Sequence, residues 1–355
     1  MIEEQIQSLT KVQIVSLTIE QVSHLTNQQI PLFTTEQIQA LTPIQIRSFN
    51  VTQIPYFTSI QIASFLPSRV SKFIEIQIVS FTKEQISLFL PSQITAFTPS
   101  QIQSFLATQI ASFLPLQVVD FTKQQVPLFT IQQIQSFLAI QIAAFTPIQI
   151  DSFWLWQIKS FLPLQVAAFT REQIASFLPL QIQSFWLWQI QSLTEDQIPA
   201  FTKIQILHLT EDQIQSFLPI QIAAFTPIQI ESFWLWQIPL FTKEQIPNFT
   251  KEQIASFTLE QIRWFTLLQI PFFTPEQVSF FTKEQISWFT EKQISSFTEQ
   301  QIPYFTKEQI QELTMEQIQS LIGQQIQSFT KEQIPFFTDM QIQWFRADQR
   351  KFFKG

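Results

Sequence analysis

Residues 133–158 read QIQSFLAIQIAAFTPIQIDSFWLWQI. Gln recurs at every eighth position of this stretch, Ile follows each Gln, and Phe comes three residues after the Ile. The same pattern runs through all 355 residues without an insertion or deletion. Counted from the position most often occupied by Thr, the consensus is T-x-x-Q-I-x-x-F, and 44 octads cover residues 2–353. A fixed short period indicates a repeat protein whose neighbouring units bury one another.

Few octads depart from this consensus. Position 4 is Gln in 43 octads and Arg69 in the other, and position 5 is Ile or Val everywhere except Arg350. Position 8 is Phe in 36 octads and Leu in eight. No linker or change of composition interrupts the pattern, which predicts one continuous solenoid over residues 2–353. The basic residues 346–355 are predicted to form a polar C-terminal cap that prevents end-to-end stacking.

Proline placement indicates one short helix in each octad. All 20 prolines fall at octad position 2 or 6, which excludes one long α-helix. In Thr146-Pro147-Ile148-Gln149 the Thr is placed as an N-cap, Pro as the first helical residue and Gln as the third. Gln at that position can complete a capping box, and the flanking Phe and Ile occupy the hydrophobic-staple positions.

The predicted fold is therefore all-α: a superhelical solenoid of about 44 very short capped helices. Helices of about six residues do not form alone, so neighbours must stabilise them. We expect Gln rather than Glu at position 4 because equivalent positions stack closely and carboxylates would repel there. Several prolines are separated by whole multiples of three octads, which suggests three octads in each superhelical turn.

Prolines at position 6 strain this prediction, because each removes a helical N–H. We expect these octads to form single turns or 3₁₀ helices. The positions are Pro31, Pro55, Pro127, Pro199, Pro239, Pro247, Pro271, Pro303 and Pro335. A β-solenoid with ladders of Gln and Thr is the alternative fold. The presence of only two glycines counts against the tight corners that a β-solenoid needs.

Composition offers little for catalysis. The chain has no Cys, two Gly and two His, and we expect His24 and His208, both at position 7, to be surface residues. The sequence therefore predicts no enzyme, no cofactor and no metal site. A net charge of −7 argues against nucleic acid as a partner. The N-terminus resembles no secretory signal, and no 18 consecutive residues are apolar, which predicts a cytoplasmic protein or export without such a signal.

The middle of the chain is unusually apolar at the helix starts. In the 22 octads that begin at residues 66–234, Leu, Ile or Trp replaces the capping residue 12 times. Three of these octads begin Trp-Leu-Trp. Two interpretations stay open: a thicker core packed between superhelical turns, or an exposed apolar interaction surface. The Trp residues concerned are Trp154, Trp156, Trp186, Trp188, Trp234 and Trp236.

Position 7 becomes aromatic late in the chain. If equivalent positions align in space, these residues form a stripe, either packed against bulky neighbours or available to a partner. The stripe would contain Trp264, Phe272, Phe280, Trp288, Tyr304, Phe336, Trp344 and Phe352.

The runs LTPIQI, FTKEQI and FTPEQV resemble the tandem octapeptide repeats of long bacterial repeat proteins, with Phe favoured over Leu here. This resemblance covers all 44 octads and implies a structural or interaction protein without catalytic residues. We predict a scaffold or self-assembling subunit whose partner is itself or another protein. An effector that binds a protein or a membrane surface, without spanning the membrane, and an ice-binding solenoid are the alternatives.

Overall fold

The structure is a computed structural model that describes residues 3–352. No strand occurs in this range, so the predicted all-α solenoid is confirmed and the β-solenoid alternative is wrong. Contacts between Cα atoms divide the chain into unit 1 (Met1–Ser184) and unit 2 (Phe185–Gly355). Ile2 and residues 353–355, which the predicted repeat and cap include, lie outside the described residues.

The described residues contain 35 α-helices and nine 3₁₀ helices, one in each octad. Unit 1 contains α1 (Glu3–Gln7), α2 (Lys11–Ser16), α3 (Ile19–Ser23), η1 (Ile30–Leu32), α4 (Thr35–Ala40), α5 (Pro43–Ser48), η2 (Ile54–Tyr56), α6 (Ser59–Ser64), α7 (Pro67–Val70), α8 (Glu75–Ile78), α9 (Lys83–Ile86), α10 (Pro91–Ile94), α11 (Pro99–Ser104), α12 (Ala107–Ile110), α13 (Pro115–Val118), η3 (Val126–Leu128), α14 (Ile131–Ser136), α15 (Ala139–Ile142), α16 (Pro147–Asp151), α17 (Leu155–Ile158), α18 (Pro163–Val166), α19 (Arg171–Ser176) and α20 (Pro179–Gln183). Unit 2 contains α21 (Leu187–Gln191), η4 (Ile198–Ala200), α22 (Lys203–Leu207), α23 (Glu211–Ser216), α24 (Pro219–Ala223), α25 (Pro227–Ser232), η5 (Leu235–Leu240), η6 (Ile246–Asn248), α26 (Lys251–Ser256), α27 (Leu259–Trp264), η7 (Ile270–Phe272), α28 (Pro275–Val278), α29 (Lys283–Trp288), α30 (Glu291–Ile294), η8 (Ile302–Tyr304), α31 (Lys307–Gln311), α32 (Met315–Ser320), α33 (Gly323–Ser328), η9 (Ile334–Phe336), α34 (Asp339–Trp344) and α35 (Ala347–Arg350).

The predicted capping box begins helix α4. The Thr34 N–H donates to Gln37 Oε1 at 2.9 Å, and the Gln37 N–H donates to Thr34 Oγ1 at 3.3 Å. Two N–H groups that a helix start leaves unpaired are thereby satisfied. The same pair of bonds recurs at most octads that have Thr at position 1, as at Thr82 with Gln85.

All nine 3₁₀ helices coincide with the nine prolines at position 6, which confirms the prediction for those octads. In η3, Pro127 has no N–H to donate, and the Leu128 N–H bonds the Gln125 carbonyl three residues earlier. The missing N–H removes an α-helical bond, so the backbone tightens to the i→i+3 pattern.

Within each unit, buried Gln side chains at position 4 also link successive superhelical turns. Gln37 Nε2 donates to the carbonyl oxygens of Ile6 at 2.8 Å and Leu9 at 2.9 Å, which lie 31 and 28 residues earlier. Ile6 lies in the last turn of α1 and Leu9 lies just beyond it, so the Gln that begins one helix caps the C-terminal end of another. The structure thus gives a more direct reason for Gln than carboxylate repulsion: only the amide supplies both an acceptor and two donor hydrogens.

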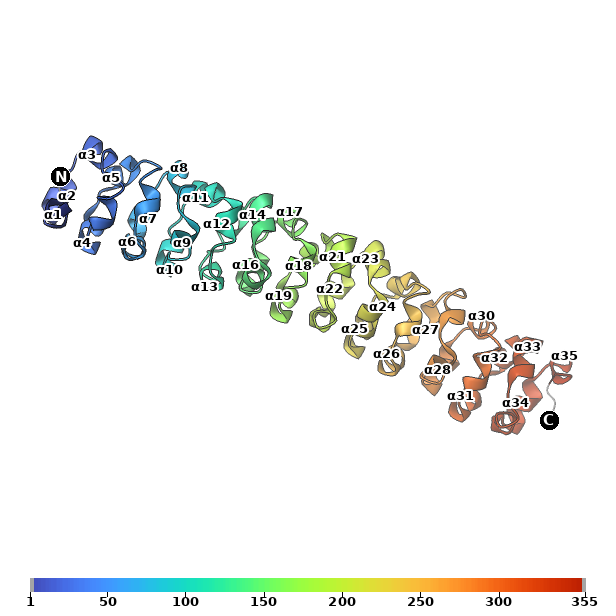
Figure 1. Ribbon diagram of the computed structural model, residues 1–355. Helices are drawn as coiled ribbons and strands as arrows, with labels where there is room; N and C mark the ends of the chain where they lie inside the picture. The colour runs from blue at the N-terminus through green and yellow to red at the C-terminus, as the bar shows by residue number, and fades with distance from the viewer. Residues whose placement is uncertain (1–2, 353–355) are drawn as a thin grey trace. The chain divides into compact units, whose positions relative to one another are not determined.

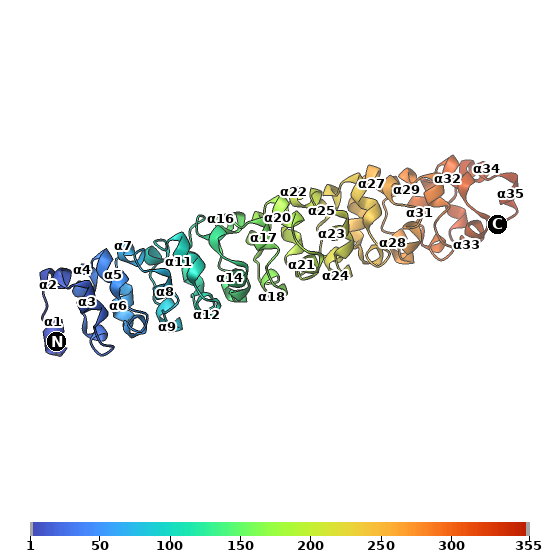
Figure 2. The same ribbon diagram turned by 90° about the horizontal axis from the view of Figure 1, so that it is seen from above.

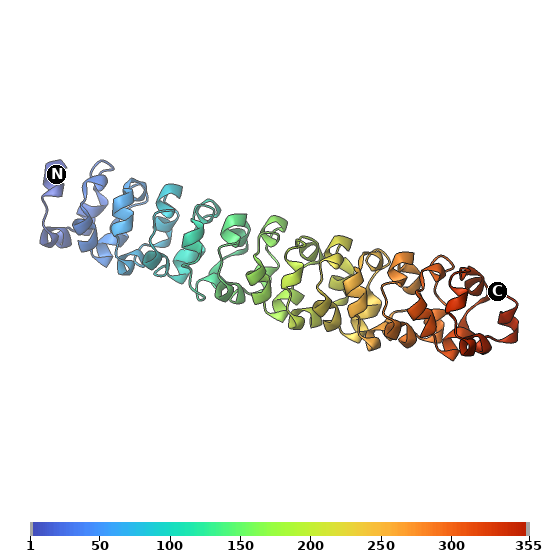
Figure 3. The ribbon, with the colours of Figure 1, turned by 90° about the horizontal axis from the view of Figure 1, so that it is seen from below.

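One turn is longer than the predicted three octads. Packed helices such as α4 and α6, or α27 and α29, do lie three octads apart in the chain. The Gln bonds nevertheless reach the octad four places earlier, so a turn contains between three and four octads. Figure 1 shows the helices of unit 1 following one another in coils from α1 to α18. Figures 2 and 3 show helices around the long axis of each unit.

Arg69 shows which function of Gln can be replaced. Its Nε donates to the Leu41 carbonyl at 2.6 Å, 28 residues earlier, as a Gln would. A guanidinium has no acceptor, so it cannot bond the N–H of Leu66 at its own helix start. The substitution keeps one bond between turns, and the helix start at Leu66 has no capping box.

The core contains position 5 and position 8. Residues such as Ile134 and Phe129 are fully buried. From Phe49 to Phe177, rings of consecutive octads meet edge to face, with centroids 5.0–5.3 Å apart. The Phe rings of consecutive octads therefore form a continuous spiral of contacts in the core of unit 1. Around this core, helices pack against helices three octads away in the chain.

Acid is expected to weaken the helix starts. Four Glu side chains at position 3 have a lowered pKa, because each accepts hydrogen bonds from its own backbone N–H and from the hydroxyl of the N-cap Thr. They are Glu36, Glu84, Glu172 and Glu332. A lowered folded pKa gives stability that is present above the unfolded value of about 4.3 and lost as pH falls through the folded pKa. Changing all four to Gln should flatten the decline of the melting temperature below about pH 4.5, measured by thermal unfolding. Glu231→Gln, at position 6, is the control and should leave the decline unchanged.

Candidate interaction surface

Sequence variation is confined to the outward positions of the octad. In the octad of α14, Gln133, Ile134 and Phe137 at positions 4, 5 and 8 are buried, whereas positions 1–3, 6 and 7 are partly or fully exposed. The backbone bonds and the core therefore recur almost unchanged while the surface chemistry changes along the chain. Any functional difference between octads must lie at these five positions.

The apolar helix starts in the middle of the chain are exposed. All 12 Leu, Ile and Trp residues at position 1 in the octads beginning at 66–234 are exposed. The six Trp residues of the Trp-Leu-Trp octads are 40–58% exposed. The interpretation of these Trp residues as a thicker core between turns is therefore wrong.

The lost Thr caps are partly compensated within the backbone. At Leu90 the N–H still bonds Gln93 Oε1, at 2.7 Å. The Gln93 N–H, which a Thr hydroxyl would accept, bonds the Leu90 carbonyl at 2.9 Å instead. An apolar residue can therefore occupy position 1 without leaving that N–H unpaired.

A hollow of about 360 Å³ lies between two turns of unit 1. Phe153, Trp154 and Leu155 line one side, where one octad ends and α17 begins, and Leu178 and Leu180 line the other side at the start of α20. Helices α17 and α20 pack against each other, which holds the two sides together. Among the residues lining this hollow, Asp151 is the only one with an ionisable side chain.

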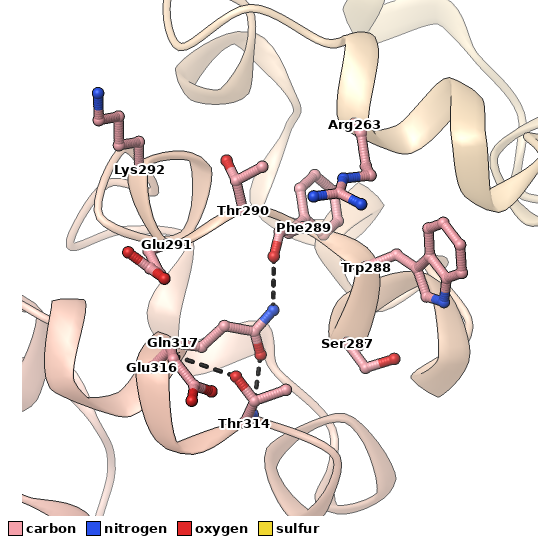
Figure 4. Close-up of a pocket in the computed structure, with 10 residues that line it drawn as sticks. All are labelled: Arg263, Ser287, Trp288, Phe289, Thr290, Glu291, Lys292, Thr314, Glu316 and Gln317. Atoms are coloured by element: carbon pink, nitrogen blue, oxygen red, sulfur yellow. Dashed lines mark hydrogen bonds between the residues drawn. The ribbon is translucent and has the colours of Figure 1, made fainter.

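The same hollow recurs in unit 2 with different chemistry. Its floor contains Phe289 and Gln317, and Gln317 Nε2 donates to the Phe289 carbonyl at 2.7 Å (Figure 4). At the helix starts, Thr290 and Glu291 take the places of Trp154 and Leu155, and Thr314 and Glu316 take the places of Leu178 and Leu180. Arg263 and Lys292 add two cations, and this hollow measures about 470 Å³. Four of its lining residues are therefore charged, against one in unit 1.

The late aromatic residues do not form one stripe. Consecutive octads point in different directions, because the helices that pack together lie three octads apart. Trp264 in α27 and Trp288 in α29 are such neighbours, and Arg263 lies 5.8 Å from the Trp288 ring centroid. The exposed members are Trp264, Phe272, Trp288 and Tyr304, whereas Phe280, Phe336, Trp344 and Phe352 are half-buried.

The described part of the predicted C-terminal cap, residues 346–352, is held by hydrogen bonds and an ion pair of its Arg side chains. Arg346 bonds the Gln319 carbonyl and forms an ion pair with Asp348 at 3.2 Å, which lowers the pKa of that carboxyl. Arg350 Nε donates to the Phe345 carbonyl at 2.9 Å. The guanidinium of Arg350, at position 5, thus donates to a position 8 carbonyl, the same kind of carbonyl to which Gln side chains donate elsewhere in the chain. Phe352 packs against Gly323, where an added Cβ would come within 2.8 Å of the ring.

Both His side chains bond a backbone carbonyl of their own helix. Nδ1–H of His24 donates to the Glu20 carbonyl at 2.7 Å, and that of His208 to the Ile204 carbonyl at 2.8 Å. Both are exposed residues at helix ends, as predicted. Within residues 3–352, no group of three His, Cys, Asp or Glu side chains could hold a metal ion. No helix in that range is long and apolar enough to cross a membrane.

The sequence pattern singled out these Trp residues without deciding whether they are exposed, and it did not predict the hollows. The signal was present, because Trp154 and Leu178 lie three octads apart and the proline spacing had suggested that interval. No protein-family model matches this chain, and no curated protein matches it.

Proposed function

We propose that this chain is a non-enzymatic structural protein that associates with itself through its apolar helix starts. The 12 exposed apolar residues at position 1 carry this proposal. Its octads resemble the tandem octapeptide repeats of bacterial structural and interaction proteins, which supports the same class. Exposed Leu, Ile and Trp side chains in this number are typical of a surface that contacts another protein.

Energetics supports association over a role in folding. A Thr cap contributes about 1 kcal/mol, and the apolar side chains that replace it stay 39–58% exposed within the chain. Burying a Leu or Trp side chain against another molecule would recover about 1.5–3 kcal/mol. Contact with a second copy would therefore offset the stability lost with the Thr caps.

Changing Trp154, Trp156, Trp186 and Trp188 to Ser should disperse assemblies without unfolding the chain. All four side chains are exposed, so their removal leaves the Ile and Phe core intact. Electron microscopy and sedimentation velocity at several concentrations should show ordered assemblies for the unchanged protein and smaller species for the variant. Far-UV circular dichroism should be the same for both.

The matched control replaces four exposed apolar residues elsewhere, Val12, Ile19, Ile44 and Ile60, by Ser. This variant should assemble like the unchanged protein. Equal dispersal by both variants would mean that general apolarity, and not the central surface, drives association. A monomer at every concentration would overturn the proposal.

Exposed Trp and Leu also suit a membrane interface, where Trp is enriched. Residues 91–190 carry only three basic side chains, Lys123, Lys159 and Arg171, so attraction to anionic lipid is weak there. Co-sedimentation with vesicles of neutral phospholipid, at protein concentrations below assembly, would identify this second function. No sedimentation with the vesicles is expected.

A further inference from the structure

We infer that the hollow beside Trp154 is a self-complementary contact in which two copies dock through the same patch. The patch comprises Trp154, Leu155, Trp156, Leu178 and Leu180 in unit 1. This inference rests on the proposed self-association and names the surface and the partner, a second copy of the chain.

The patch combines a hollow with an exposed Trp side chain that could fill the hollow of a second copy. The hollow of about 360 Å³ lies between α17 and α20, and its walls are mostly apolar. Trp156, two residues after Trp154 on the same helix start, is 45% exposed. In a two-fold arrangement, Trp156 of each copy enters the hollow of the other, since a two-fold contact joins one patch to itself.

Charge selects this hollow over its equivalent in unit 2. Asp151 is the one ionisable residue that lines it, and its side chain is exposed at the rim. The unit 2 hollow carries Glu291 and Glu316 in the places of Leu155 and Leu180. A two-fold contact there would take these carboxylates and the cations Arg263 and Lys292 out of water in each copy, and the cost of desolvating four charged residues opposes docking.

The area predicts a weak dimer. Half-exposed Trp and Leu side chains leave roughly 80–120 Å² each to be covered, so the five residues offer about 450 Å² in each copy. Stable dimers bury about 800 Å² in each partner, and weak complexes less than about 600 Å². The dimer should therefore be weak, forming at high protein concentration and dissociating on dilution.

The repeat supplies a close internal comparison. Residues 213–238 match residues 133–158 except at two positions, so Trp234 and Trp236 stand in nearly the same local sequence as Trp154 and Trp156. The octad three places after that of Trp234 has Thr258 and Glu260 where unit 1 has Leu178 and Leu180. A carboxylate therefore takes the place of Leu180 beside Trp234 and Trp236, and these two Trp residues should contribute less to docking.

The test is sedimentation velocity of the full chain over a wide concentration range, for four variants. Leu180→Glu places a carboxylate in the hollow, and Trp156→Ser removes the side chain that fills it. Each should weaken dimerisation by about tenfold or more. The controls are Leu268→Glu, at the same octad position and also highly exposed, and Trp236→Ser. Both controls should dimerise like the unchanged chain, and circular dichroism should show that all four fold.

The outcomes separate this inference from the proposed function. If the unchanged chain associates and Leu180→Glu associates equally well, the hollow is not the contact, although self-association stands. Equal loss from Trp156→Ser and Trp236→Ser would also overturn the assignment to this hollow. A chain that is monomeric at all concentrations, or that binds only to phospholipid vesicles, would overturn both.

Discussion

Gln141→Glu is expected to destabilise unit 1 by about 4–5 kcal/mol at pH 7. Gln141 is 1% exposed, and its Nε2 donates to the carbonyl oxygens of Ile110 at 2.9 Å and Phe113 at 2.6 Å. A carboxylate there would face two oxygens. Protonating it at pH 7 costs about 3.7 kcal/mol from an ordinary pKa near 4.3, and the single O–H then satisfies only one carbonyl, which costs about 1 kcal/mol more.

The pH dependence of this variant follows from the same geometry. Burial beside two carbonyl oxygens raises the pKa of the introduced Glu in the folded state. Its folded form therefore binds more protons than its unfolded form, and stability is lost as pH rises above the unfolded pKa. Urea unfolding should show a deficit of about 4–5 kcal/mol at pH 7 that shrinks to about 1–2 kcal/mol near pH 4.

Gln13→Glu is the matched control. Gln13 Oε1 accepts from the Thr10 N–H at 2.8 Å, and among the described residues its Nε2 bonds no other turn. A carboxylate keeps that capping bond and suits the positive end of the helix, so a change within about 0.5 kcal/mol is expected. Equal losses at Gln13 and Gln141 would show that the capping box, and not the link between turns, requires the amide.

Phe129→Ala is expected to cost about 3–5 kcal/mol. Phe129 is fully buried and meets Phe121 and Phe137 edge to face, with both centroid distances 5.1 Å. The variant loses the buried ring, two aromatic pairs worth about 0.5–1.5 kcal/mol each, and leaves a cavity on the axis. Phe129→Leu should cost less, about 1–2 kcal/mol, because Leu fills much of the space and occurs at position 8 in eight octads.

The measurement is urea unfolding of both variants, followed by circular dichroism and fitted with a nearest-neighbour repeat model, since long arrays lose two-state cooperativity. Leu116→Ala is the surface control, because Leu116 is 82% exposed, and should change stability by less than about 0.5 kcal/mol. A loss for Phe129→Ala no larger than that of the control would contradict a continuous aromatic core.

Local features were predictable because they depend on residues close together in the chain. The Thr34–Gln37 capping box joins residues three positions apart, and the 3₁₀ helix at Pro127 follows from one missing N–H. The exposure of Trp154 was not predictable, because position 1 could face a neighbouring turn or solvent. The hollow also required two octads separated by two others in the chain, those of Trp154 and Leu178, to be placed together.

The sequence by itself determined the octad, its short capped helix, the buried Ile and Phe positions and the nine 3₁₀ turns. Each depends on bonds or steric limits within a single octad, which recur whatever the winding. Only the tertiary structure decided that Gln37 bonds carbonyls 28 and 31 residues earlier, that a turn contains between three and four octads, and that the Trp-Leu-Trp helix starts face solvent. The physical reason is that these features depend on the angle between successive helices. That angle depends on how the Phe rings of neighbouring octads pack in the core and how helices three octads apart pack around it. It therefore cannot be derived from the residues of a single octad.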